Sequence, residues 1–228
     1  MENERPPLFF SGEGPTAPRL FTIGHSNHEL GVFLRLLHAA GATAVADVRS
    51  APYSPRYPHY NREELERALS ARGLVYVFLG DLLGGRPQRP SLYDPDGRVN
   101  YERVRQAAEF REGLDRLVSG LDQHTPALLC AEEDPLDCHR GLMITPALGE
   151  LGLAPVHLRG DGSAETTAAM EQRLLSETGV GAGVLDGLFA AAVTDDERRR
   201  LLAEAYRLRA RRKAFRWRPE ASDEEAAG

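Results

Sequence analysis

Cysteine is scarce in this chain: Cys130 and Cys138 are the only two among its 228 residues. Two cysteines cannot build the disulfide framework of a small extracellular domain, and these two do not form the paired CxxC spacing of a structural zinc site. A chain of this length buries about 70% of its unfolded surface on folding, so its core needs no disulfide. We therefore expect two unpaired thiols, with Cys130 inert inside an apolar strand.

Long apolar runs and a leader sequence are also missing. No stretch approaches the roughly 20 apolar residues that a membrane-spanning helix requires. The N-terminus at 1–18 is polar and rich in proline, glycine and glutamate, unlike a signal peptide. We expect a cytoplasmic protein with no membrane partner. The formal net charge of −6 disfavours a protein that coats nucleic acid.

The usual phosphate-binding loops are absent. No GxxxxGK[ST] occurs, and Gly84-Gly85 lacks the strand–GxGxxG–helix context of a dinucleotide site. Only one residue separates Cys138 from Arg140, whereas the loop of cysteine phosphatases is longer. These absences exclude the commonest ATP, dinucleotide and phosphoenzyme sites.

What is present is a regular alternation of strands and helices. Short runs rich in β-branched residues alternate with stretches of helical periodicity. The predicted strands are 20–24, 43–48, 74–79, 126–131 and 154–158, and the predicted helices are 28–40, 62–72, 101–120, 142–151 and 164–176. Asn27 and Asn61 are candidate N-caps, and Pro146 is expected to kink its helix or to shorten the regular part of it. This order predicts an α/β fold: a mostly parallel sheet with helices on both faces in a Rossmann-like layered arrangement.

The chain divides by composition into four parts. We expect a disordered lead-in at 1–18, an α/β domain at 19–178, a helical C-terminal extension at 179–218 and a disordered acidic tail at 219–228. The extension carries an apolar stripe at 184–193 that we expect to dock on the domain, followed by a strongly basic helix. That helix could bind nucleic acid or an acidic partner, although a merely solvated helix fits its charge order better.

Polar residues follow several of the predicted strands. In an open parallel sheet the carboxyl ends of the strands meet at one edge, where ligands bind. The residues expected at this edge are His25, Ser26, Asn27, Asp47, Arg49, Glu132, Cys138, His139 and Arg140. They come from distant parts of the sequence, so the topology predicts a shared site.

Cys138-His139-Arg140 is the most distinctive of these elements. A cysteine at a helix N-terminus tends toward thiolate, and an arginine offers paired donors to an anion. Cys138 is thus a candidate nucleophile, against the alternative of a small packed residue. Arg140 is a candidate anion ligand, against a structural ion pair with a nearby carboxylate. His139 is a base, a ligand or a hydrogen-bonding support.

The other edge residues have similar pairs of alternatives. His25 is a candidate general base or a loop hydrogen bonder. Asp47 and Arg49 share one face, where they form either a structural pair or an acid/base group beside an anion donor. Tyr53 and Tyr60, with Tyr57 between them in a proline-rich loop, either stack on a ligand ring or anchor the loop.

Four motifs in register resemble the bacterial and archaeal family called domain of unknown function 488. They are Thr22-Ile-Gly-His-Ser-Asn27, Asp47-Val-Arg-Ser-Ala-Pro52, Leu79-Gly-Asp-Leu-Leu-Gly-Gly85 and Leu129-Cys-Ala-Glu132 with Cys138-His-Arg140. The resemblance spans about 20–158 and implies an α/β fold with a site at these motifs. Pro146 departs from the uninterrupted helix that usually follows Cys-His-Arg in the family.

Two functions follow from these residues. The first is an enzyme acting on a small anionic, phosphate-bearing ligand, such as a nucleotide or nucleic acid, with Cys138, His25 and Asp47 as catalytic residues. The second is a non-catalytic nucleotide- or nucleic-acid-binding or sensory module that uses the same edge. Cys138, His139, His25 and Asp47 could together hold a metal, but no paired CxxC or HxxxH spacing supports such a site, so we expect no metal and no cofactor.

Overall fold

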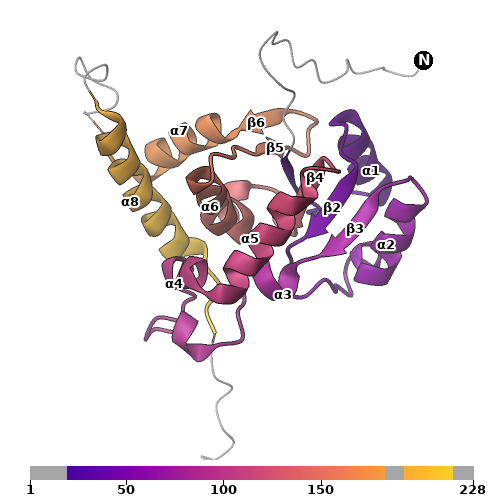
Figure 1. Ribbon diagram of the computed structural model, residues 1–228, viewed down its shortest axis with the longest axis horizontal. Coiled ribbons are helices and arrows are strands. Elements are labelled where there is room, and N and C mark those ends of the chain that lie inside the picture. The colour runs from indigo at the N-terminus through magenta and orange to yellow at the C-terminus, as the bar shows by residue number, and fades with distance from the viewer. Residues whose placement is uncertain (1–19, 183–192, 218–228) are drawn as a thin grey trace, which may run out of the picture.

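A six-stranded sheet forms the centre of the protein, in a computed structural model that describes residues 20–182 and 193–217 (Figure 1). The strands are β1 (Phe21–Gly24), β2 (Ala44–Asp47), β3 (Val75–Phe78), β4 (Pro126–Cys130), β5 (Val156–Leu158) and β6 (Ala164–Thr166). Their order is β3-β2-β4-β1-β5-β6, and all pairs are parallel except β5 with β6. The predicted mostly parallel sheet is confirmed.

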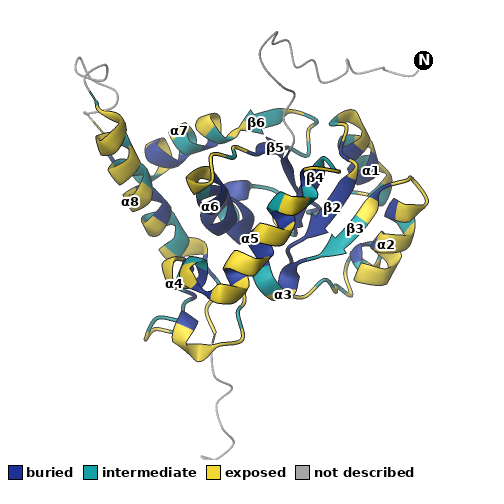
Figure 2. Cartoon of the chain, viewed as in Figure 1, coloured by how far each residue is buried: buried dark blue, intermediate teal, exposed yellow. Residues whose placement is uncertain are grey.

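Helices cover both faces of this sheet. They are α1 (Leu30–Ala39), α2 (Arg62–Ser70), α3 (Gly80–Leu83), α4 (Tyr101–Gln106), α5 (Ala108–Gly120), α6 (Thr145–Glu150), α7 (Thr167–Thr178) and α8 (Asp195–Lys213). Helices α1 and α2 share one apolar core with Ala127 and Leu129, whereas Leu128 points into a second core with α5, α6 and α7. Figure 2 shows the buried central strands between these two layers.

The connections change face between β1 and β4. Helix α1 follows β1 and packs on one face, while α6 follows β4 and packs on the other. Strands β1 and β4 are direct neighbours in the sheet. At such a switch point the loops after the two strands diverge and leave a crevice beyond their carboxyl ends. The fold therefore places the segments after Gly24 and Cys130 on the two sides of one opening.

The predicted caps of the first two helices need correction. The N-cap of α1 is Glu29 rather than Asn27, and it makes no side-chain cap. Asn61 does occupy the N-cap of α2, but its Oδ1 accepts a hydrogen bond from the Ser54 N–H at 2.7 Å. The amide therefore holds the proline-rich loop in place, because that loop folds back onto the start of the helix.

Three other predicted elements have different bounds. The helix predicted for 101–120 breaks at Ala107, whose ψ of 145° is extended. Strand β6 and the short helix α3 occupy segments predicted as helix and loop. A π-helical turn, Arg140–Ile144, precedes α6. Pro146 then lies in the first turn of α6, where its missing N–H costs no helix hydrogen bond.

The C-terminal helix is present as predicted, ending at Lys213. It packs on α7, and Tyr206 donates a hydrogen bond to Glu171 at 3.1 Å. The apolar stripe predicted at 184–193 lies outside the described residues except for Val193, as do the lead-in at 1–18 and the tail at 219–228. Among the helices within the described ranges, none is long and apolar enough to cross a membrane.

Candidate functional site

A cavity of about 820 Å³ opens at the carboxyl ends of β1, β2 and β4. We call it the rim cavity. The predicted site residues that line it are His25, Ser26, Asn27, Arg49, Tyr53, Glu132, Cys138 and His139. Asp47, Tyr60 and Arg140 lie behind its wall. Two other cavities contain no predicted site residue: one of about 1090 Å³ beside α8, and one of about 950 Å³ between the loop at 86–97 and the segment at 215–217, which shares Arg86 and Phe215 with the rim cavity.

Cys138 follows a 3₁₀ turn, Pro135–Asp137, and its carbonyl accepts the first hydrogen bond of the next helical segment, from Leu142. The predicted position at a helix start is therefore correct. The expected drift toward thiolate is not: burial, and then a hydrogen bond with Cys130, raise the pKa of the Cys138 thiol well above its ordinary value. Arg140 lies 3.2 Å from the sulfur and opposes this shift without overcoming it.

Arg140 is fully buried and binds protein groups instead of facing the cavity. Its guanidinium donates to the backbone carbonyls of Glu132 and Glu133, to the Thr22 hydroxyl and to the Cys138 sulfur. These contacts use four of its five N–H donors, and the residue is fully buried, so the structure gives this arginine a clamping position rather than the anion contact expected from the sequence. The clamp holds the segment after β4 against β1.

Asp47 and Arg49 form a buried ion pair, one of the two alternatives left open by the sequence. The guanidinium donates through Nε to Oδ1 at 2.9 Å and through Nη2 to Oδ2 at 2.6 Å. Tyr76 donates a further hydrogen bond to Oδ2 at 2.8 Å. With both oxygens engaged and no exposure, Asp47 orients Arg49, and Arg49 alone reaches the cavity wall.

His25 enters the cavity wall directly after β1. Its ring stacks on Tyr60 with centroids 4.3 Å apart, and Nδ1 lies 2.9 Å from the Ser26 carbonyl oxygen. A carbonyl only accepts, so Nδ1 carries the proton and Nε2 has a free lone pair. Burial, reinforced by the charge of Arg49, lowers the pKa of His25 to about 4. The imidazole is therefore neutral near pH 7.

The tyrosines of the proline-rich loop divide between the two predicted uses. Tyr60 is fully buried and donates to the His28 carbonyl at 3.0 Å, so it anchors the loop and supports His25. Tyr53 is 71% exposed and lines the cavity, as does Tyr57. Only these two have faces that a bound ring could contact.

Cys130 is buried, as predicted for a core residue, but its sulfur also contacts polar groups of the cavity wall. Its side chain lines the cavity, donates to the Glu132 carboxylate at 2.9 Å and lies 3.6 Å from Nδ1 of His139. Strand alternation gives no signal of these contacts, because it places Cys130 on the same face as the core residue Leu128. Arg86, Lys213 and Phe215 are further lining residues that the sequence did not indicate.

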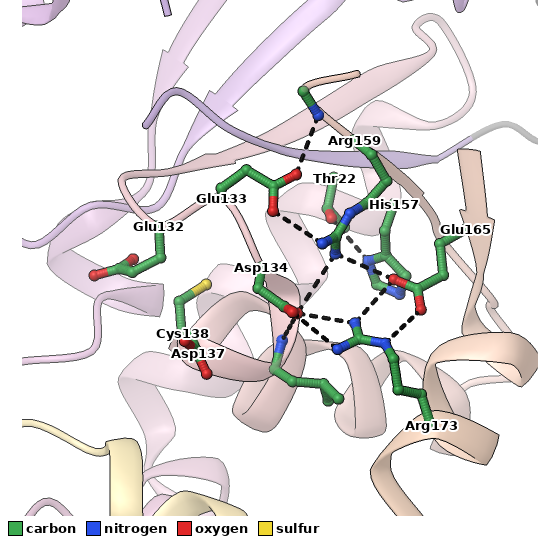
Figure 3. A network of polar contacts seen from close by, with 12 residues as sticks. Thr22, Glu132, Glu133, Asp134, Asp137, Cys138, His157, Arg159, Glu165 and Arg173 are labelled. Atoms are coloured by element: carbon green, nitrogen blue, oxygen red, sulfur yellow. Dashed lines mark hydrogen bonds and ion pairs between the residues drawn. The ribbon is translucent and has the colours of Figure 1, made fainter. Parts of the chain in front are cut away.

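Ion pairs outside the cavity hold the acidic turn that follows β4. Figure 3 shows the Glu132 carboxylate on the side of Cys138, while Glu133 points toward Arg159. Arg159 pairs with Glu133 at 2.9 Å, and Arg173 pairs with Asp134 at 2.8 Å. Both arginines also pair with Glu165 of β6. The network joins β6 and α7 to the segment that carries Cys138.

One of three comparisons with known proteins found a match. The model of one family, described as "Domain of unknown function DUF488", matches residues 29–145. The match includes Cys130, Glu132, Cys138 and His139 and begins just after His25. No curated protein and no solved structure matched the chain. The matched segment contains β2, β3, β4 and the Cys-His-Arg element. Because it spans just over half of the sequence, the chain belongs to the DUF488 family.

Proposed function

We propose that the protein is an enzyme that binds a small anionic, phosphate-bearing ligand in the rim cavity. The supporting observation is that cationic groups and a neutral imidazole converge on one opening at the switch point of the sheet. Arg49 and Arg86 line it together with His25. Ligands of open α/β sheets bind at this position, and arginines suit the paired oxygens of phosphate.

Arg86 is the cation best placed to meet such a ligand. Its guanidinium lies over the ring of Phe215, 4.7 Å from the centroid. Unlike Arg49, it is exposed and pairs with no carboxylate anywhere in 20–182 or 193–217. An anion there gains a charge-assisted hydrogen bond without first breaking an ion pair. Tyr53 and Tyr57, which line the same cavity, add faces on which the base of a nucleotide would stack.

His25 is the proposed general base. The Asp47 oxygens are occupied, whereas Nε2 of His25 has no protein partner in the part of the chain that the structure describes. The hydrogen bond to the Ser26 carbonyl fixes the tautomer in which Nε2 accepts a proton. Ser26 adopts a φ of 47°, a left-handed conformation that turns the chain immediately after the imidazole.

Binding is tested by calorimetric titration of the full chain with AMP, inorganic phosphate, pyrophosphate and a short oligothymidine. We expect at least one probe to bind, and Arg86→Met to weaken its binding about 10-fold or more, since one charge-assisted contact is worth at least 1.4 kcal/mol. Arg72→Met is the matched control. Arg72 is exposed in the turn before β3, at the amino ends of the strands and so away from the rim cavity. Equal losses in the two variants, or no binding by any probe, contradict the proposal.

Catalysis is tested separately by following the bound probe with phosphorus NMR. We expect wild type to convert the probe, and His25→Gln to bind it with little change while turnover falls. Binding without turnover by wild type supports the alternative of a non-catalytic binding module. The relevant observation for that alternative is that Asp47 and Arg140, two of the polar groups at this edge, are committed to protein contacts.

A further inference from the structure

Cys130, Cys138 and His139 form a compact cluster in the wall of the rim cavity. One ligand atom from each lies within 4.8 Å of the other two, and all three residues are buried. We call these residues the thiol–imidazole cluster. Two thiols and an imidazole are the donor set that zinc prefers, and three protein ligands are typical of zinc sites that keep one position open. We propose that this cluster binds a zinc ion.

The imidazole is already in the tautomer that a metal needs. Nε2 of His139 lies 2.8 Å from the Val48 carbonyl oxygen, which can only accept, so Nε2 carries the proton. Nδ1 is then an unprotonated donor atom, and it faces the thiols, 3.6 Å from the Cys130 sulfur. A backbone carbonyl behind the protonated nitrogen is the usual support of a metal-ligating histidine.

The spacing fits a tetrahedral ion. With zinc–sulfur and zinc–nitrogen bonds of about 2.3 and 2.0 Å, the sulfur and nitrogen of one tetrahedral edge lie about 3.5 Å apart. The corresponding separation of Cys130 Sγ and His139 Nδ1 is 3.6 Å. This edge of the cluster therefore accepts zinc with almost no movement of either side chain.

Two neighbours adapt the surroundings to such a site. Arg140 donates from Nη1 to the Cys138 sulfur at 3.2 Å, which supports a metal-bound thiolate. Gly85 leaves room for the imidazole, since a Cβ there would lie 2.9 Å from Cγ and Nδ1 of His139. Both neighbours are therefore compatible with a metal bound by Cys138 and His139.

The fourth position faces the cavity. All three cluster residues line it, and the Glu132 carboxylate stands beside them, 2.9 Å from the Cys130 sulfur. A zinc ion there would leave one coordination position to water, to Glu132 or to a ligand in the cavity, as catalytic zinc sites do. The site uses neither Arg86 nor His25, so it stands or fails separately from the proposed anion site.

The test is zinc titration of the full chain, reduced and stripped of metal, against a chromophoric chelator. We expect one zinc per chain and a loss of affinity of at least about 100-fold in Cys130→Ser and in Cys138→Ser. His139→Gln should also weaken binding. His38→Gln, an exposed histidine on α1, is the control and should bind as wild type does. The assignment is clean because the sequence contains no other cysteine.

Cobalt substitution of wild type keeps the test decisive if a variant fails to fold. We expect thiolate-to-cobalt charge-transfer absorption and the intense visible bands of a tetrahedral ion. Absence of stoichiometric zinc binding in reduced wild type, or a cobalt spectrum without thiolate bands, overturns the proposal. So does wild-type affinity in both serine variants. Arg86→Met should retain zinc, so loss of anion binding with zinc binding intact would count only against the proposed function.

Discussion

Gly24 determines how the chain passes over the end of β1. A Cβ at this position would lie 1.7 Å from the Glu132 carbonyl oxygen and 2.9 Å from the Glu133 Cα. The same carbonyl accepts a hydrogen bond from Arg140. The clash is with backbone that the arginine clamp holds in place, so no side-chain rotation relieves it. A single missing side chain thus permits the segments after β1 and β4 to meet.

We therefore expect Gly24→Ala to lower the free energy of unfolding by about 3 kcal/mol or more, because the backbone after β4 must shift and the Arg140 hydrogen bonds must lengthen. Urea denaturation measures this change. Gly149→Ala is the matched control: its Cβ meets nothing within 4 Å on the exposed side of α6, and it should stabilise the protein by about 0.5–1 kcal/mol. A Gly24→Ala protein as stable as wild type would contradict the assigned clash.

Among single residues, Cys130 shows the limit of sequence reasoning. Its apolar neighbours led to the expectation of an inert core residue, and burial at 2% exposure agrees with that expectation. The end of β4, however, directs its sulfur toward His139 rather than into the apolar core. Burial and chemical inertness are different properties, and hydrophobic pattern predicts only the first.

At the scale of elements, α8 supports the turn that carries Cys138. Arg209 donates to the Asp137 carboxylate at 2.8 Å and to the Leu136 carbonyl at 3.0 Å. Lys213 also pairs with Asp137, at 2.9 Å. The basic end of this helix is therefore engaged with the α/β domain, next to the rim cavity.

Removing this support should loosen the turn. We expect Arg209→Met to lower the free energy of unfolding by about 1–3 kcal/mol, because it leaves the partly buried Asp137 with one cation fewer. Hydrogen exchange of the amides at 136–138 should also accelerate. Arg200→Met, on an exposed turn of the same helix, should change stability by less than about 0.5 kcal/mol. Equal exchange in the two variants would show that α8 does not hold the turn.

The bounds of some helices and strands can be predicted from the sequence and those of others cannot. Four-residue runs such as Ala44–Asp47 were found from composition because their neighbours along the chain determine them. The break at Ala107 is not predictable from the sequence, since alanine favours helix and the residue is nevertheless extended. The π-helical turn before Pro146 was missed for a similar reason: proline predicted an irregularity there but not its form.

At the scale of the whole molecule, two buried histidines make the stability of the fold depend on pH. Burial lowers the pKa of His25 from 6.5 to about 4 and that of His157 from 6.5 to about 3. His157 bonds through Nδ1 to the Thr22 hydroxyl at 2.8 Å, and its Nε2 has no partner among the residues described. The folded protein therefore holds both imidazoles neutral.

The lowered pKa values determine how the free energy of unfolding changes with pH. As the pH falls below 6.5 the unfolded chain binds protons that the folded protein does not, so the free energy of unfolding decreases until about pH 4 for His25. His25 alone should account for roughly 3 kcal/mol over this interval. Urea denaturation from pH 7 to pH 4 measures the loss, which His25→Gln should reduce and the exposed His38→Gln should not. A pH-independent stability over this range would contradict the buried neutral state.

Local pattern determined the order of strands and helices, the parallel sheet and the edge where the polar residues gather, because each depends on residues close in the chain. The tertiary structure decided the partners. In the folded protein Arg140 is buried and donates to two backbone carbonyls, and Asp47 is paired with Arg49. The sulfur of Cys130 lies close to Cys138 and His139. Burial and mutual distance arise from segments far apart in sequence, so the chemistry available to a side chain follows from the fold rather than from its neighbours in the chain.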